Sequence, residues 1–193
     1  MFSRFTRLVL TLAAVSVLAF ATAGALQAQP LSEEFFGSYV GSGTAQNVID
    51  KTSEKRDLDV SVVAYKNNGF TMKWITVVRD SKGSRTGEGV KRREVEENFL
   101  PLEGRENVYV LAPKGGLFKR AELPNPLRGE PMRWASVEDK SITVYSIAID
   151  DNGKSEMQVY RRTLSDKGMD VSYLRMLDEN IVVTLKGTLA RTK

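Results

Sequence analysis

The sequence of 193 residues contains no histidine and no cysteine. Without imidazole, a Ser-His-Asp triad, a zinc site of His and Cys ligands and a His-ligated haem are all excluded. Without thiols, the chain has neither disulfides nor the cysteine that an N-terminal lipid anchor requires. Any catalysis would depend on Asp, Glu, Lys, Tyr or Ser, and the fold must be held together by its own core.

A strong charge of either sign is also lacking. Lys and Arg number 28 against 24 Asp and Glu, which gives a formal net charge of +4 and a pI of about 9.3. The basic residues are spread along the chain, whereas a nucleic-acid-binding protein concentrates them in a patch. The acidic run Asp150–Gly153 lacks the spaced carboxylates of a calcium loop and is typical of a hairpin turn. We therefore expect no nucleic-acid partner, no metal site and no cofactor.

The first 28 residues have the layout of a signal peptide. Two arginines precede an apolar run over residues 8–26, and small residues at 21–28 offer several cleavage sites. An uncleaved membrane anchor is the alternative, because the run is almost long enough to span a bilayer. We expect cleavage, a periplasmic or secreted protein without a stable membrane anchor, and a single domain over residues 29–193.

From residue 36 onward, short alternations of apolar and polar residues are separated by turn signals about every ten residues, which predicts an all-β fold. The expected fold is an antiparallel up-and-down β-barrel of eight to ten strands. Residues 45–55 are the best helical candidate. The long segment 112–131, rich in proline and glycine, is interpreted either as a binding loop or as a surface loop. The predicted strands are 36–46, 57–66, 70–79, 90–99, 106–112, 132–137, 141–149, 154–164, 169–177 and 181–191.

Turn lengths predict which residues share a face of the barrel, because a slip of one residue inverts a strand. We expect a three-residue loop at 67–69, with Gly69 left-handed and Lys66 paired with Phe70. Loops at 165–168 and 178–180 set Tyr160 against Tyr173 and Tyr173 against Leu185. For the turn at 150–153, either plausible length places Tyr145 with Tyr160. The predicted interior face contains Tyr145, Ile147, Tyr160, Arg162, Val171, Tyr173, Arg175, Val183, Leu185 and Leu189.

The row of tyrosines with two arginines is the best candidate for a ligand-binding site. It consists of Tyr145, Tyr160, Arg162, Tyr173 and Arg175. An arginine inside a barrel is costly unless an anion meets it, so the row predicts a pocket for an acidic head group. The alternative is cross-strand packing, with the arginines extended toward the barrel ends. No catalytic residues are expected.

The opening strand carries glycines at 37, 41 and 43 around Tyr39. A phosphate loop would need a buried strand before the glycines and a helix start after them, and the sequence has neither. Gly37-x-Tyr39 near the start of an all-β chain instead resembles the opening strand of lipocalin-like barrels. In those families the motif is Gly-x-Trp, and a basic residue of the last strand packs over the aromatic ring. The resemblance implies that Tyr39 closes the barrel base beneath Arg191.

The resemblance implies a function as well as a fold. We expect an exported binding protein for a small hydrophobic or amphipathic ligand, with an acidic ligand favoured by the arginines. Tyr173-x-Arg175 is similar, in reverse order, to the pair that holds the ligand carboxylate in fatty-acid-binding proteins. The alternative is an envelope interaction module or inhibitor with a filled barrel, using its loops and an apolar patch near Leu117 and Phe118. An enzyme of the barrel-isomerase type is a third interpretation, for which no catalytic constellation is visible.

Overall fold

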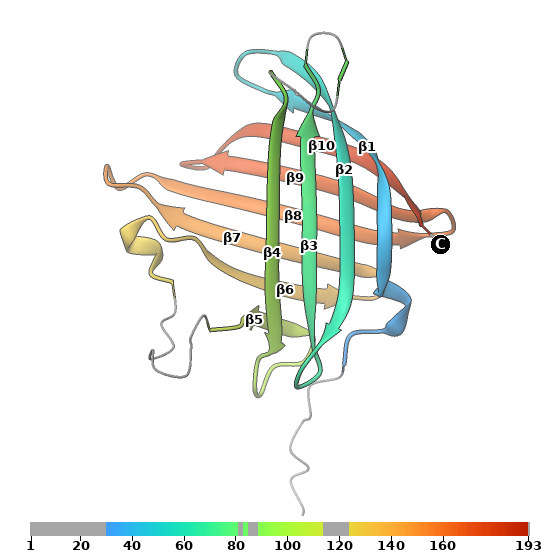
Figure 1. The fold of residues 1–193 in the computed structure, drawn as a ribbon. Helices are drawn as coiled ribbons and strands as arrows, with labels where there is room; N and C mark the ends of the chain where they lie inside the picture. Colours follow the sequence, from blue (N-terminus) through green and yellow to red (C-terminus); the bar gives the residue numbers. More distant parts are fainter. Residues whose placement is uncertain (1–29, 81–82, 85–88, 114–123, 193) are drawn as a thin grey trace, which may run out of the picture.

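The computed structural model describes residues 30–80, 83–84, 89–113 and 124–192, which form a closed antiparallel β-barrel (Figure 1). Each strand pairs with its neighbour in the sequence, and the last strand pairs with the first. This confirms the predicted up-and-down barrel. The strands are β1 Gly37–Asn47, β2 Thr52–Tyr65, β3 Gly69–Val78, β4 Lys91–Pro101, β5 Val108–Leu111, β6 Met132–Glu138, β7 Ser141–Ile149, β8 Ser155–Ser165, β9 Gly168–Leu177 and β10 Asn180–Arg191.

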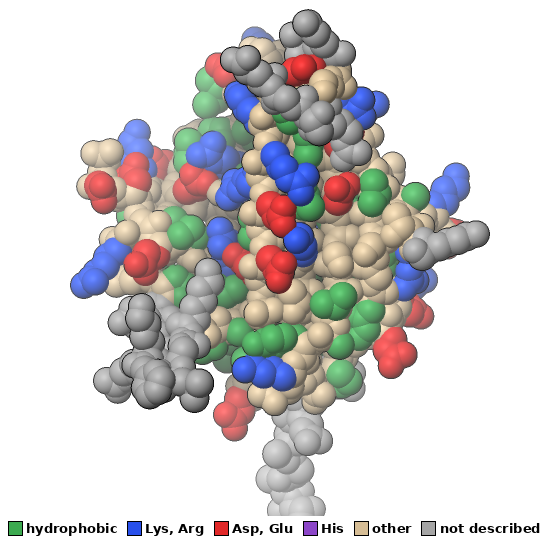
Figure 2. Space-filling view, in the orientation of Figure 1, with side chains coloured by type: hydrophobic (Ala, Val, Ile, Leu, Met, Phe, Trp, Pro, Cys, Tyr) green, Lys and Arg blue, Asp and Glu red, His purple; other side chains and the backbone are tan. Residues whose placement is uncertain are grey.

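The barrel is flattened into two layers that enclose the core. Figure 1 shows β2, β3 and β4 in front, crossing β7, β8 and β9 behind them at a steep angle. Alternate residues of each strand point inward, as the pleat requires, and the outward ones are mostly polar on the front layer. Ion pairs such as Lys73–Glu94, with 2.6 Å between Nζ and Oε1, lie on this outer surface, where Figure 2 shows charged side chains. The largest fully buried side chains are Phe35, Tyr39, Phe70, Met72, Phe99, Tyr109, Ile142 and Met169.

One end of the barrel, the base, is closed by the segment that precedes β1. The short 3-10 helix η1 (Glu33–Phe35) buries Phe35 against the core, and the Tyr39 hydroxyl donates a hydrogen bond of 3.1 Å to the Phe35 carbonyl. The Arg191 guanidinium lies 5.7 Å from the Tyr39 ring centroid and donates to the Phe36 carbonyl. The predicted closure of the base by Tyr39 and Arg191 is confirmed.

The first and last strands approach one another closely where they close the barrel. A Cβ atom added to Gly187 would lie 2.7 Å from both the Cα of Gly43 and the carbonyl oxygen of Ser42. Backbone atoms cannot move aside as a flexible side chain can, so this contact requires glycine. The glycines of β1 thus serve barrel closure.

The helix predicted over 45–55 is wrong. Strand β1 continues to Asn47, and β2 begins at Thr52 after a tight turn. The Asn47 side-chain oxygen accepts hydrogen bonds from the backbone N–H groups of Ile49 (3.0 Å) and Asp50 (3.1 Å). Asparagine often forms such a turn with its own side chain, and this local bonding replaces a helix start. Among the described residues, helical structure is limited to η1 and η2 (Pro126–Arg128).

The β2–β3 hairpin has the predicted faces but a different register. Tyr65 pairs with Gly69 and Ala64 with Phe70, two residues away from the predicted pairing of Lys66 with Phe70. The left-handed residues are Asn67 and Asn68, with φ of 55° and 59°, and not Gly69. A shift of two residues preserves the side-chain parity, so the predicted apolar face of β2 and β3 is the interior face.

The two hairpins that join β8, β9 and β10 bear out the predicted pairs. Tyr160 pairs with Tyr173, and Tyr173 pairs with Leu185. The turn between β9 and β10 is nevertheless shorter than predicted, because Leu177 pairs with Asn180. A register shift between Ile181 and Val183 then adds one residue to β10 and restores the predicted parity.

The predicted register of the β7–β8 hairpin is wrong. The Asp150 N–H donates to the Lys154 carbonyl (2.9 Å), and the three residues between them end with Gly153 at a φ of 77°. This three-residue loop pairs Tyr145 with Val159 and inverts β7 relative to the prediction, which placed Tyr145 on the face of Tyr160. Tyr145 therefore lies on the outer face, and Ile147 points outward with it.

Candidate functional site

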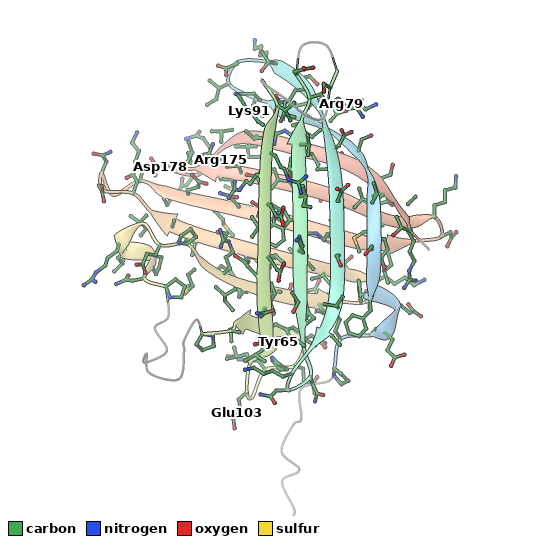
Figure 3. All side chains as sticks on the ribbon, viewed as in Figure 1. Tyr65, Arg79, Lys91, Glu103, Arg175 and Asp178 are labelled. Atoms are coloured by element: carbon green, nitrogen blue, oxygen red, sulfur yellow. The ribbon has the colours of Figure 1, made fainter. Side chains whose placement is uncertain are left out.

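A cavity of about 330 Å³ lies in the part of the barrel away from the base. It is bounded by the first half of β2, the end of β3, the start of β4 and the middle of β8, β9 and β10. In Figure 3 this end of the barrel is marked by Lys91, which is among the residues around the cavity. Its apolar wall consists of Leu58, Trp74, Val78, Val171 and Leu185.

The Arg162 side chain lies against this cavity and is buried. The residue is 4% exposed, and its Nε and Nη1 atoms have no hydrogen-bond partner among the described residues. Its guanidinium carbon lies 5.1 Å from the Trp74 ring centroid and 5.6 Å from that of Tyr160. Burial lowers the pKa of Arg162 to about 10, although Tyr160 and Glu97 act in the opposite direction. Even so, Arg162 carries its charge at neutral pH.

Three aromatic rings continue from Arg162 along the cavity wall. The ring centroids of Trp74 and Tyr160 are 5.5 Å apart, and those of Tyr160 and Tyr173 are 4.7 Å apart. Burial raises the pKa of both tyrosines above the usual value, so both hydroxyls stay protonated and can donate hydrogen bonds. The Tyr160 hydroxyl donates to the Gln158 side-chain oxygen. The cavity thus has a row of mutually tilted aromatic rings beside a buried cation.

Arg175 has a partner inside the barrel. Its Nη2 atom lies 2.7 Å from Oε2 of Glu156. The other carboxylate oxygen of Glu156, Oε1, accepts a hydrogen bond from the Gln158 side chain. The hydrogen bond from Arg175 lowers the pKa of Glu156, so this carboxylate is ionised at neutral pH. Arg175 and Glu156 therefore neutralise one another, and the free donor among the predicted arginines is Arg162.

The structure brings together four of the five predicted site residues. Tyr160, Arg162 and Tyr173 line the cavity, and Arg175 lies beside them through its pairing with Gln158 and its ion pair with Glu156. Tyr145 is separated from them, because it lies on the outer face of β7 and stacks on Trp134 with 5.1 Å between ring centroids. Trp134 is also on this outer face.

The sequence prediction missed Arg93, which lines the rim of the cavity. Arg93 pairs with Thr76, two residues beyond the Trp74–Val95 pair, so it shares the inward face with Trp74. Residues 91–98 alternate in charge, which is typical of a solvated strand and concealed the inward position of Arg93. The inward apolar positions Val95 and Phe99 in the same segment were the signal that could have placed Arg93.

The charges on the interior face do not balance. Five arginines face the part of the interior away from the base, at positions 56, 93, 133, 162 and 175, against glutamates at 54, 97 and 156. The ion pairs are Arg56–Glu54, Arg133–Glu97 and Arg175–Glu156. Among the described residues, no acidic side chain forms an ion pair with Arg93 or Arg162. Lys91 shares the inward face through its pairing with Val78 and likewise forms no ion pair with a described residue. The cavity therefore carries an excess of positive charge at three positions.

Other kinds of site find no support in the described part of the chain. It contains no group of three acidic side chains that could hold a metal ion. Within the same residues, no helix has the length and apolar character needed to cross a membrane.

Comparison with known proteins names no family for the chain. No family model matches the chain, and no curated protein matches it. Among solved structures, it is similar to the S-type phycobiliprotein lyase CPES of Guillardia theta, with 12% identity over 83% of this chain and 90% of that chain and a TM-score of 0.37. It is also similar to a candidate lipoprotein of Parabacteroides distasonis ATCC 8503, with 13% identity over 85% and 97% and a TM-score of 0.28.

With TM-scores this low, neither likeness carries an argument about a ligand. The class of the protein follows from its own topology and site. The chain folds as a lipocalin-like ten-stranded barrel, with a base closed by Tyr39 and Arg191 and a cavity beside a buried arginine.

Proposed function

We propose that this protein is an exported binding protein that holds a small amphipathic carboxylate in the barrel cavity, with Arg162 as the anion anchor. The observation that carries the proposal is a buried guanidinium with two N–H-bearing nitrogens unpartnered beside a cavity. A buried charge without a partner is costly, and buried polar groups in folded proteins are almost always hydrogen-bonded. A carboxylate that enters the cavity beside Arg162 would neutralise this buried charge and accept hydrogen bonds from its guanidinium.

The rest of the cavity suits the apolar part of such a ligand. Leu58, Val171 and Leu185 form an aliphatic wall, and Trp74 with Tyr160 forms an aromatic one. Small-molecule sites typically combine apolar walls with a few fixed polar groups in this way. The ligand's carboxylate would contact Arg162, and its hydrocarbon would replace water along the walls.

The cavity favours this function over the filled-barrel alternative, because a barrel that acts only through its loops has no need of an interior space. The apolar patch expected near Leu117 and Phe118 lies outside the described residues. Export is inferred from the signal-like residues 1–28, and removal of this segment would release the barrel as a soluble domain.

Calorimetric titration with octanoate tests the proposed function. We expect octanoate to bind the wild-type protein and the Arg162→Met variant to bind it about ten- to a hundredfold more weakly. A lost hydrogen bond to a charged group is worth about 1.5–3 kcal/mol. Arg105→Met is the matched control, because Arg105 has the same charge, is exposed in the turn between β4 and β5 and does not line the cavity.

The two variants separate a specific anchor from a general loss of positive charge. Arg105→Met should bind octanoate as the wild type does. No binding by the wild type, or equal binding by Arg162→Met, would contradict the proposed role of the cavity.

A further inference from the structure

A second cation stands at the rim of the cavity, above the buried one. Arg93 lines the cavity from β4, is exposed and forms no ion pair with any described residue. Its positive charge lowers the pKa of Tyr160, Tyr173 and Glu156, although other causes outweigh it for the tyrosines. The Arg93 side chain is therefore close enough to act electrostatically on the inner wall.

The strand register gives the relative depth of the two cations. Arg162 lies over the Trp74 ring, and Arg93 pairs with Thr76, two residues further along β3 toward the rim. Two residues of a strand span roughly 7 Å. Apolar side chains accompany both cations, because Leu58 pairs with Thr76 at the level of Arg93 and Val171 pairs with Arg162. The cavity wall thus offers a cation at two depths with apolar surface beside each.

The cavity is also small in volume. A volume of about 330 Å³ equals that of about eleven water molecules at roughly 30 Å³ each, which is near the lower limit for small-molecule sites. Toward the base the barrel is filled by buried side chains such as Phe70, Met72 and Phe99. A ligand with its carboxylate at Arg162 cannot extend toward the base, so its far end must emerge at the rim beside Arg93.

These observations say what the far end of the ligand should be. A long apolar tail would leave the cavity among the charged rim residues Glu54, Lys91 and Arg93, which are poor partners for hydrocarbon. A second anionic group at that end would instead meet the unpaired Arg93 guanidinium.

We propose that the ligand is a compact molecule with an anionic group at each end, such as a short dicarboxylate, held between Arg162 inside and Arg93 at the rim. This inference rests on the proposed function, since it assigns the inner carboxylate to the same anchor. It narrows the proposed carboxylate ligand to one that carries a second anionic group at its far end.

Matched ligands of equal chain length test the role of the rim. Octanedioate has a carboxylate at each end, whereas octanoate has one. Calorimetry on the wild type should show octanedioate binding roughly two- to fivefold more tightly than octanoate, an increment limited by the exposure of Arg93. Because the rim is exposed to salt, this advantage should shrink as ionic strength rises.

Variants of two exposed arginines complete the test. Arg93→Met should remove the advantage of octanedioate and leave octanoate binding within about twofold of the wild type. Arg105→Met is the matched control, because Arg105 is exposed in the turn between β4 and β5 and does not line the cavity. It should leave the preference unchanged.

The outcomes separate this inference from the proposed function. If octanoate binds through Arg162 but octanedioate binds no more tightly, the two-anion ligand is wrong and the proposed function stands. Equal weakening of both ligands by Arg93→Met would likewise overturn the assignment of Arg93 to the second anion. If neither ligand binds the wild type, both proposals are wrong.

Discussion

Replacing Arg162 by methionine should make the unliganded protein more stable. Burial lowers the pKa of Arg162 from 12.5 to about 10, and at 1.36 kcal/mol per pKa unit this corresponds to a cost of about 3 kcal/mol for the charged group. The variant also loses the contacts of the guanidinium with Trp74 and Tyr160, worth together about 1–2 kcal/mol. The expected net gain in the free energy of unfolding is therefore about 1–2 kcal/mol.

Urea and thermal unfolding measure this gain directly. For a domain of this size, about 1–2 kcal/mol corresponds to an increase in Tm of roughly 2–8 °C. Below pH 10, Arg162 is charged in both the folded and the unfolded state, so the difference between wild type and variant should be constant. As the pH rises through about 10, the folded wild type loses the proton, the penalty is relieved and the difference should narrow.

Added ligand should reverse the order of the two proteins. Octanoate at a hundred times its Kd stabilises a protein that binds it by about 2.7 kcal/mol, and Arg162→Met should gain far less. A variant that is less stable than the wild type without ligand, by about 1 kcal/mol or more, would refute the reasoning. It would mean that Arg162 is stabilised within the protein and needs no anion.

Three further predictions concern closure, the base and the interior ion pair. Gly187→Ala should destabilise the fold by roughly 1–3 kcal/mol in urea unfolding, because its Cβ meets the backbone of Gly43; an unchanged midpoint would contradict the close approach. Phe35→Ala should cost about 3–5 kcal/mol in thermal unfolding, and a loss under 1 kcal/mol would show that the base does not need this side chain. Arg175 lowers the pKa of Glu156, so the stability from this carboxylate is present above about pH 4.3 and is lost as the pH falls through the folded-state pKa. Glu156→Gln should therefore be less stable than wild type near pH 7, with a deficit that shrinks below about pH 4; a deficit independent of pH would contradict the ion pair.

The fold was predictable because local sequence patterns indicate where the strands and turns lie. Alternation of apolar and polar residues, interrupted by turn signals, predicted all ten strands near their observed positions. Long-range closure was also predictable at the base, because the motif around Tyr39 implies a partner at the end of the last strand, and Arg191 takes that place. These features depend on residue type and spacing alone.

The site was less predictable, because each hairpin must have the correct parity before distant residues meet. The β9–β10 pairs were predicted correctly although the turn is shorter than expected, since the register shift near Ile181 compensates. The β7–β8 turn has no such compensation, so Tyr145 was placed on the wrong face. The partner of Arg175 could have been found, because Glu156 has the same parity on β8 as Tyr160.

The closed base determines how the barrel can be attached to anything else. Pro30 enters beside the base through Leu31 and η1, and Thr192 leaves near Ser38, where its N–H donates to the Ser38 carbonyl at 2.8 Å. Both ends of the described chain are thus at the end of the barrel opposite the cavity. A tag, a fused domain or a surface linkage at either end would orient the cavity outward, so the protein can be immobilised for binding measurements without obstructing ligand entry.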